Sequence, residues 1–341
     1  MLSARAFAAG AAGENIGPLH CQTINRMPYR SYFRGLILIL GLVLGLGLGT
    51  PAILTAAETP ATPEVAEQGV PITAQAPIPT LRYLTNSIVF AAICTLILLV
   101  LARRATARME LIPRGTQNWF EALVEGLYEM LEGIVGKHMI TRTFPLLATI
   151  FIYILTANWF GLLPGVGTIG FGERSGPFSL TEVTAPVLRP ASADLNMTLA
   201  IAGLFMCVWL YWTFTVTGPI QFLKEIFGPK GGLTGILKLF LIPIFVFVGF
   251  IEVISIAFRL VSLSMRLYGN IFAGENLLHA MSTLGDKLPL PLAYLSSIVL
   301  PLPFYFLELL VGLIQALVFM LLCAVYVQLS TTHQEDTAAE H

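Results

Sequence analysis

The feature that most constrains this chain is a series of long apolar segments, two of which exceed the length needed to cross a membrane. Residues 236–283 and 289–329 are mainly apolar, whereas about 20 apolar residues of helix are enough to span the ~30 Å of hydrocarbon in a bilayer. Three shorter apolar segments precede them, at 86–101, 144–163 and 195–217. The pattern predicts an all-α, polytopic membrane protein with five transmembrane helices.

Charged residues are too scarce to coat a water-exposed surface. Asp, Glu, Lys and Arg make up 11% of the 341 residues, compared with about 25% in soluble globular domains. The 19 basic and 20 acidic residues nearly cancel, which excludes a nucleic-acid binder built on a basic surface. The cysteines and histidines show no metal-ligand spacing and no phosphate-binding loop motif occurs, so we expect no metal, no cofactor and no nucleotide site.

The last two apolar segments are too long for simple upright spans. As one helix, the 48 residues of 236–283 would measure ~70 Å. We therefore expect two long, tilted C-terminal helices that pack against something curved.

Residues 115–137 show a different pattern. Apolar residues recur there every three or four positions, and Glu121, Glu125, Glu129 and Glu132 lie between them. This periodicity predicts an amphipathic helix that lies on the membrane surface or on a partner.

The N-terminal region has the pattern of a processing signal. From Met27, a possible true start, a basic stretch is followed by an apolar run and then by small residues, as in a signal peptide. The alternative is a sixth transmembrane helix at 35–56. We expect a leader at 1–57 and a polar proline-rich tail at 58–82. A membrane domain at 83–330 and a polar C-terminal tail at 331–341 follow.

Basic residues predict the orientation in the membrane. The stretch after the first span carries Arg103 and Arg104, and the stretch after the third carries Lys224 and Lys230. Because cytoplasmic loops are rich in Lys and Arg, we expect the N-terminus outside and the C-terminus in the cytoplasm. A signal peptide and an outward N-terminus favour a bacterial inner membrane, with an organellar inner membrane as the alternative.

Ionisable residues inside the apolar segments are the candidate functional residues, because each is costly in hydrocarbon. Glu252, Arg259 and Arg266 are seven residues apart and so share one helix face, which Ser255 and Ser262 border. Glu252 and Arg259 are either part of a path or a structural ion pair. Arg266 is a fixed positive charge, since its guanidinium cannot lose its proton.

A second polar track follows on both long segments. Asn270 extends the Arg266 stripe by one turn, and Glu275 lies about 180° around the helix from Arg266. On the last segment Glu308 and Gln315 are seven residues apart. Two polar tracks on neighbouring helices suggest a path for an ion.

The residues around Arg266 resemble a known family. The segment 262–275, SLSMRLYGNIFAGE, looks like the signature of subunit a of F-type ATP synthases, with an asparagine four residues after the arginine and an acidic residue or histidine nine after it. Further similar segments are ANWFGLLPG, ASADLNMTLA and GLIQALVFMLLCAVYV, at 157–165, 191–200 and 312–327. The resemblance covers about 83–330.

The resemblance implies roles for single residues. Arg266 would be the essential stator arginine that faces a rotating ring of c subunits. The resemblance assigns an outer half-channel to Glu275, Glu308, Asn270, Gln315 and Asn158, and an inner half-channel to Glu252, Arg259, Ser255 and Ser262. Many relatives carry one Glu and one His at the positions of Glu275 and Glu308. His279 is either a substitute imidazole or an ordinary interfacial residue.

The implied function is that of a proton-channel stator with no enzyme activity of its own. Its partners would be the c ring, the b subunits near the amphipathic helix, the rest of the ATP synthase and the lipid bilayer. The alternatives are the same subunit in a sodium-coupled ATP synthase, a secondary ion transporter and a structural membrane anchor.

Overall fold

The computed structural model describes residues 86–106, 115–163, 166, 170–174, 180–186, 188–228, 236–284 and 292–339. The expected leader at 1–57, the alternative span at 35–56 and the tail at 58–82 lie outside these residues. Within the described ranges, five helices are long and apolar enough to cross a membrane. The predicted α-helical membrane fold with five spans is thus confirmed.

The first three spans are α5 (Asn86–Thr106), α7 (Ile140–Gly161) and α8 (Leu195–Val216). Helix α7 begins four residues before the expected 144–163 and contains Pro145. Because proline has no backbone N–H, the Thr141 carbonyl lacks its usual helical hydrogen bond. The Thr149 hydroxyl donates to the Pro145 carbonyl, a separate contact one turn further along the helix.

The amphipathic helix predicted at 115–137 is α6, Thr116–Val135. It lies between Gly115 and Gly136, whose φ angles of 60° and 81° favour glycine. Its apolar face buries Leu127 and Leu131, and Glu125 and Glu129 are exposed.

The two long C-terminal helices differ in how well the sequence predicted them. Helix α10, Ile236–Thr283, matches the expected segment. The segment 289–329 instead forms α11 (Leu292–Val299) and α12 (Pro301–Ala339). The break falls at Pro301 because a proline lacks a backbone N–H and fits the first position of a helix. Helix α12 also continues through most of the polar C-terminal tail.

Two stretches between the predicted spans contain regular structure. In 218–235 the helix α9, Pro219–Phe227, follows Gly218, whose φ is 82°, and has its proline at the helix start. In 164–193, β1 (Gly170–Arg174) and β2 (Leu180–Pro186) form an antiparallel pair, and the short helix η3 (Ala191–Ala193) follows. These elements are additions to the helical fold.

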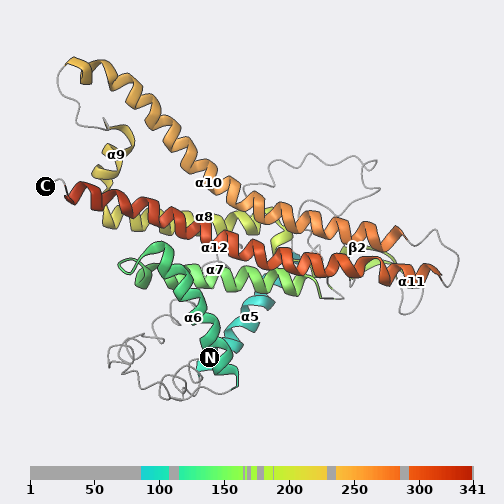
Figure 1. The fold of residues 1–341 in the computed structure, drawn as a ribbon. Coiled ribbons are helices and arrows are strands. Elements are labelled where there is room, and N and C mark those ends of the chain that lie inside the picture. The colour runs from blue at the N-terminus through green and yellow to red at the C-terminus, as the bar shows by residue number, and fades with distance from the viewer. Residues whose placement is uncertain are drawn as a thin grey trace, which may run out of the picture.

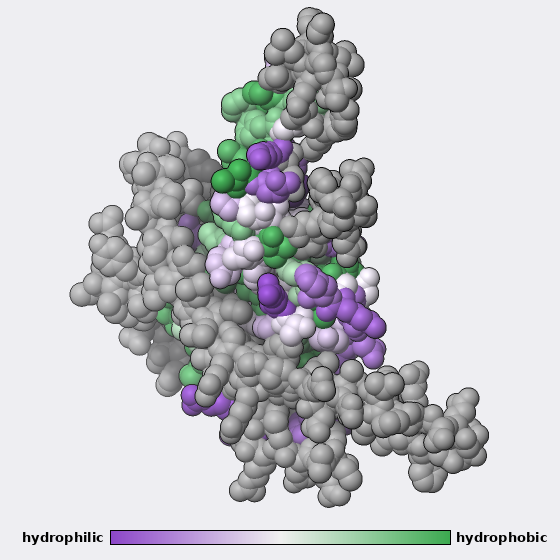
Figure 2. Space-filling model, turned by 90° about the vertical axis from the view of Figure 1, so that its left-hand side faces the viewer, coloured by the Kyte–Doolittle hydropathy of each residue, from purple (hydrophilic) through white to green (hydrophobic). Residues whose placement is uncertain are grey.

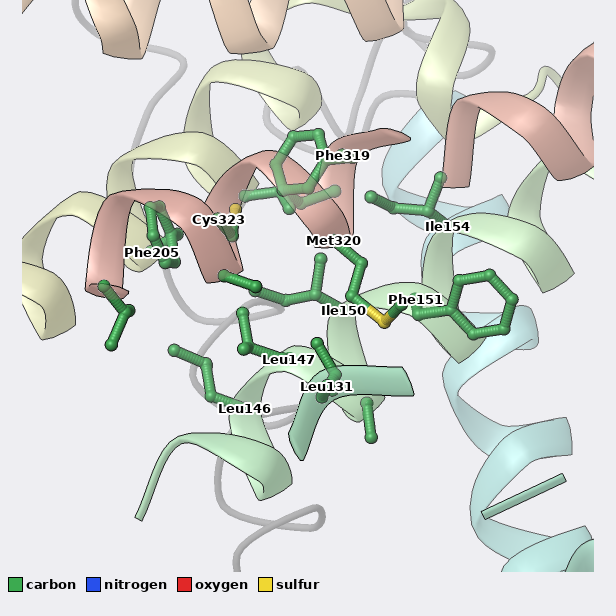
Figure 3. Close-up of a cluster of buried hydrophobic side chains, with 14 of the residues drawn as sticks. Leu131, Leu146, Leu147, Ile150, Phe151, Ile154, Phe205, Phe319, Met320 and Cys323 are labelled. Carbon is green, nitrogen blue, oxygen red and sulfur yellow. The ribbon is translucent and has the colours of Figure 1, made fainter. Parts of the chain in front are cut away.

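Helices α7, α8 and α12 run alongside one another, and α5 and α6 lie across one side of them (Figure 1). The main core forms where α6, α7, α8 and α12 meet (Figure 3). The labelled buried side chains include Leu131, Leu147, Phe205, Phe319 and Met320, all at most 1% exposed.

Helix α10 is only partly covered. It packs on α8 and α12 along one part and diverges from α12 toward its own N-terminus (Figure 1). In the view from that end, apolar residues gather in the upper part of the coloured surface and hydrophilic residues gather lower down (Figure 2). Its exposed apolar side chains include Phe247, Phe250, Ile251, Ile254, Phe258, Val261 and Met265. A face this apolar suits a lipid or a protein partner rather than water.

Candidate ion path

Arg266 lies on the uncovered face of α10, inside the candidate span Pro243–Ser282. Its side chain is exposed, as are those of Ser262 and Met265 beside it. Within the part of the chain that the structure describes, Arg266 forms no ion pair, hydrogen bond or ring contact. The helix therefore presents a permanent positive charge outward on an apolar surface.

Glu252 and Arg259 form an ion pair, with 3.8 Å between Arg259 Nη2 and Glu252 Oε1. The Arg259 guanidinium also lies 5.0 Å from the centre of the Tyr326 ring on α12. The pair is partly exposed, so it adds little to stability by itself. Ser255 and Ser262 are exposed and lie on the outward face with Arg266 rather than in this pair.

Asn270 and Gln315 join the two long helices. The Asn270 amide donates to Gln315 Oε1 at 2.6 Å, one turn beyond Arg266. Gln315 is 4% exposed, and its Nε2 has no hydrogen-bond partner among the described residues.

Glu308 is a buried acid on α12 that packs directly against Gly274 of α10. It is 5% exposed, and its Oε1 has no hydrogen-bond partner among the described residues. A Cβ at position 274 would overlap the Glu308 carboxyl group. A side chain at position 274 would therefore displace the Glu308 carboxyl group from its present position.

Asn158 joins three elements at a buried position. Its Oδ1 accepts a hydrogen bond from Ser192 Oγ of η3 at 2.7 Å, and its Nδ2 donates to the Gly312 carbonyl of α12 at 3.2 Å. The neighbouring Trp159 indole donates to the Leu309 carbonyl at 3.1 Å. These contacts fix the end of α7 against α12.

Glu275 pairs with Arg189, with 3.7 Å between Glu275 Oε2 and Arg189 Nη2. Sequence reasoning assigned no role to Arg189. Its position two residues before the similar segment 191–200 was the available signal. His279 also acts electrostatically on Glu275.

Asp194, which lies just outside the third span, is close to the same cluster. Its carboxylate caps α8 by accepting a hydrogen bond from the Asn196 backbone N–H at 3.1 Å. Burial raises the pKa of Asp194 above its ordinary value, and the Asn196 N–H and the Arg189 charge oppose part of that rise.

The polar residues thus form two groups on opposite sides of Arg266 along α10. From the helical rise, Glu252 lies ~21 Å before Arg266 and Glu275 ~13 Å after it. Among the described residues, no group of three His, Cys, Asp or Glu side chains is arranged to hold a metal ion. The arrangement suits the movement of a charge in two separate steps.

Comparison with known proteins identifies the family. The ATP synthase A chain family matches residues 84–328. The chain belongs to this family. It is 33% identical over 251 residues to ATP synthase subunit a of Campylobacter fetus subsp. fetus (strain 82-40). The match covers 72% of this chain and 88% of that protein. ATP synthase subunit a of Mycobacterium ulcerans (strain Agy99) is 32% identical over 260 residues. The match covers 74% of this chain and 89% of that protein.

A third relative, ATP synthase subunit a of Geobacter sp. (strain M21), is 32% identical over 253 residues, or 73% of this chain and 88% of that protein. As a member of the ATP synthase A chain family, the chain is a multi-pass membrane component of an ATP synthase complex. It belongs to the membrane sector that transports ions for ATP synthesis.

Proposed function

We propose that this chain is the stationary channel subunit of its ATP synthase, with two offset half-channels for protons. The observation that carries the proposal is the setting of Arg266. It is a permanent charge on the outward apolar face of a membrane span, has no partner among the described residues, and lies between two separate polar groups.

The partner at this face is a ring of c subunits, each with a carboxyl group at the depth of Arg266. A carboxylate that has lost its proton is attracted to the guanidinium, whereas a protonated carboxyl can move into lipid at low cost. Because Arg266 cannot accept a proton, it also blocks direct transfer between the two polar groups. Protons must then travel with the rotating ring.

The outer half-channel consists of Asn158, Asn270, Glu275, Glu308 and Gln315. Support comes from buried polar atoms of Glu308 and Gln315 that have no hydrogen-bond partner among the described residues. Such atoms are costly in an apolar interior unless water or a proton carrier reaches them.

The inner half-channel consists of Glu252, Ser255, Arg259 and Ser262. A proton released from the ring leaves along this side of Arg266. We place this side in the cytoplasm of a bacterium and the outer side in the periplasm, in keeping with the basic residues Arg103, Arg104 and Lys224. The b subunits bind near α6, and the chain itself carries no nucleotide chemistry.

The two polar groups divide the membrane potential between them. Each elementary charge that crosses the membrane releases ~2.3 kcal/mol per 100 mV. Because neither half-channel crosses the whole membrane, this energy appears as rotation of the ring rather than as a leak.

The test is ATP-driven proton pumping by the purified complex in proteoliposomes, with the Arg266→Ala variant. We expect assembly close to that of the unmodified complex and loss of pumping. Arg142→Ala removes an exposed arginine at the start of α7 and serves as the control, with pumping retained. Normal pumping by Arg266→Ala would refute the stator assignment. Pumping that required added Na⁺ would instead favour the sodium-coupled form.

A further inference from the structure

A second buried arginine, Arg189, lies beside the outer group of residues. It belongs to the extended segment between β2 and η3 and is 1% exposed. Burying a guanidinium away from water costs several kcal/mol unless charged partners compensate. The buried Arg189 guanidinium therefore requires charged partners that offset the cost of its burial.

Two acidic groups lie near this arginine. Glu275 pairs with Arg189, and Asp194 acts on it electrostatically from the start of α8. Tyr268 and His279 are close to the same groups, since Arg189 acts electrostatically on Tyr268 and His279 acts on Glu275. Tyr268, Glu275 and His279 are seven and four residues apart, so they lie on one face of α10. Arg189 thus meets the titratable face of α10 from the segment that precedes η3.

The geometry of the pair leaves Glu275 able to react. The separation of 3.7 Å between Arg189 Nη2 and Glu275 Oε2 is longer than the ~2.7–2.9 Å of a charge-assisted hydrogen bond. Glu275 Oε2 is buried and accepts no hydrogen bond from the described residues. Arg189 therefore holds the carboxylate by charge without occupying the oxygen that would receive a proton.

The two outer acids meet different segments. Glu275 pairs with Arg189, two residues before η3, whereas Glu308 of α12 meets α10 at Gly274. Arg189 and His279 both act electrostatically on Glu275.

We propose that Arg189 is a positioning residue of the outer half-channel that holds Glu275 in place as the first proton acceptor. The proposal rests on the proposed function, because it assumes that Glu275 carries protons. A guanidinium cannot release its proton at working pH, so Arg189 acts through Glu275 and not as a carrier itself.

The experiment compares four variants of the complete ATP synthase: Arg189→Gln, Arg189→Lys, Glu275→Gln and the double variant Arg189→Gln with Glu275→Gln. The readout is the initial rate of ATP-driven proton pumping in proteoliposomes, divided by the amount of assembled complex. Arg142→Gln is the control for the loss of an arginine charge at an exposed position.

We expect Arg189→Gln to lower the rate by about tenfold or more, the effect that loss of an orienting partner has around metal ligands. The pumping rate of Arg189→Lys is expected to lie between the rates of Arg189→Gln and the unmodified complex, because a single ammonium holds a carboxylate less firmly than the planar guanidinium does. The double variant is expected to pump at the rate of Glu275→Gln alone, since Arg189 has nothing left to position.

Each other outcome has a definite meaning. An unchanged rate in Arg189→Gln, or a double variant whose loss is the product of the two single losses, would overturn the positioning role. If Arg189→Gln failed to assemble and Arg189→Lys pumped normally, the charge would be purely structural, which also overturns it. Normal pumping by Glu275→Gln would instead count against the proposed function of Glu275, whatever Arg189 does.

Discussion

The Asn158 contacts allow a quantitative test of how α7, η3 and α12 are held together. The Asn158 side chain is 3% exposed and makes two hydrogen bonds, to Ser192 and to Gly312. Side-chain hydrogen bonds in membrane proteins contribute ~0.6 kcal/mol on average and up to ~1.7 kcal/mol. Asn158→Ala is therefore expected to lower the free energy of unfolding by about 1–3 kcal/mol.

A double-mutant cycle separates one of these bonds from the loss of packing. Asn158→Ala, Ser192→Ala and the double variant are unfolded with sodium dodecyl sulfate in mixed micelles, and tryptophan fluorescence reports the transition. The expected coupling energy between the two positions is about 0.6–1.7 kcal/mol, because only the bond from Ser192 Oγ to Asn158 Oδ1 is shared.

Ser264→Ala is the matched control for the cycle. Its hydroxyl is also buried, but it donates within α10 to the Val261 carbonyl at 3.1 Å. Combined with Asn158→Ala, it is expected to show no coupling. A coupling energy near zero for the pair of Asn158 and Ser192, or an equal value for the control pair, would refute the reasoning.

Two further predictions concern packing and pH. Gly274→Ala would force the flexible Glu308 carboxyl group to move away and is expected to slow proton pumping with little loss of stability, whereas Gly269→Ala, where a Cβ meets open space, serves as the control. Equal pumping by both variants would show that Glu308 does not lie against Gly274. Burial raises the pKa of Asp194, so the folded chain binds the Asp194 proton more tightly than the unfolded chain does. The protonated Asp194 therefore adds to the free energy of unfolding at low pH. This added stability is lost as pH rises from the ordinary pKa of 3.8 through the pKa in the folded chain. Asp194→Asn, which keeps an oxygen for the α8 cap, is expected to lack this decline in detergent unfolding between pH 4 and 8, and an identical decline would contradict the assignment.

Periodicity predicted the long elements well, because a membrane span needs a fixed length of apolar helix. The bounds of α10 agree with the apolar segment, and the opposite directions of Arg266 and Glu275 follow from 100° of rotation per residue. The short helix α9 and the pair β1 and β2 were not predicted, because short elements depend on their packing more than on their own sequence.

The partners of the polar residues were also beyond the sequence. Spacing along α10 places Glu275 on a face, but nothing in that spacing shows which distant segment meets it. The pairing with Arg189 depends on how the segment before η3 folds back onto α10. The same holds for Glu308 and Gly274, which lie on different helices and touch only because those helices approach closely.

The exposed position of Arg266 has a consequence for the life of the chain before it is assembled. Alone in a bilayer, the chain would hold a permanent charge against lipid, at a cost of ~2.5–3.5 kcal/mol for an arginine at mid-membrane. A partner that brings a carboxylate to this face would relieve that cost, which corresponds to about a hundredfold in binding affinity. An unassembled copy would therefore be less stable in the bilayer than a copy whose arginine is paired.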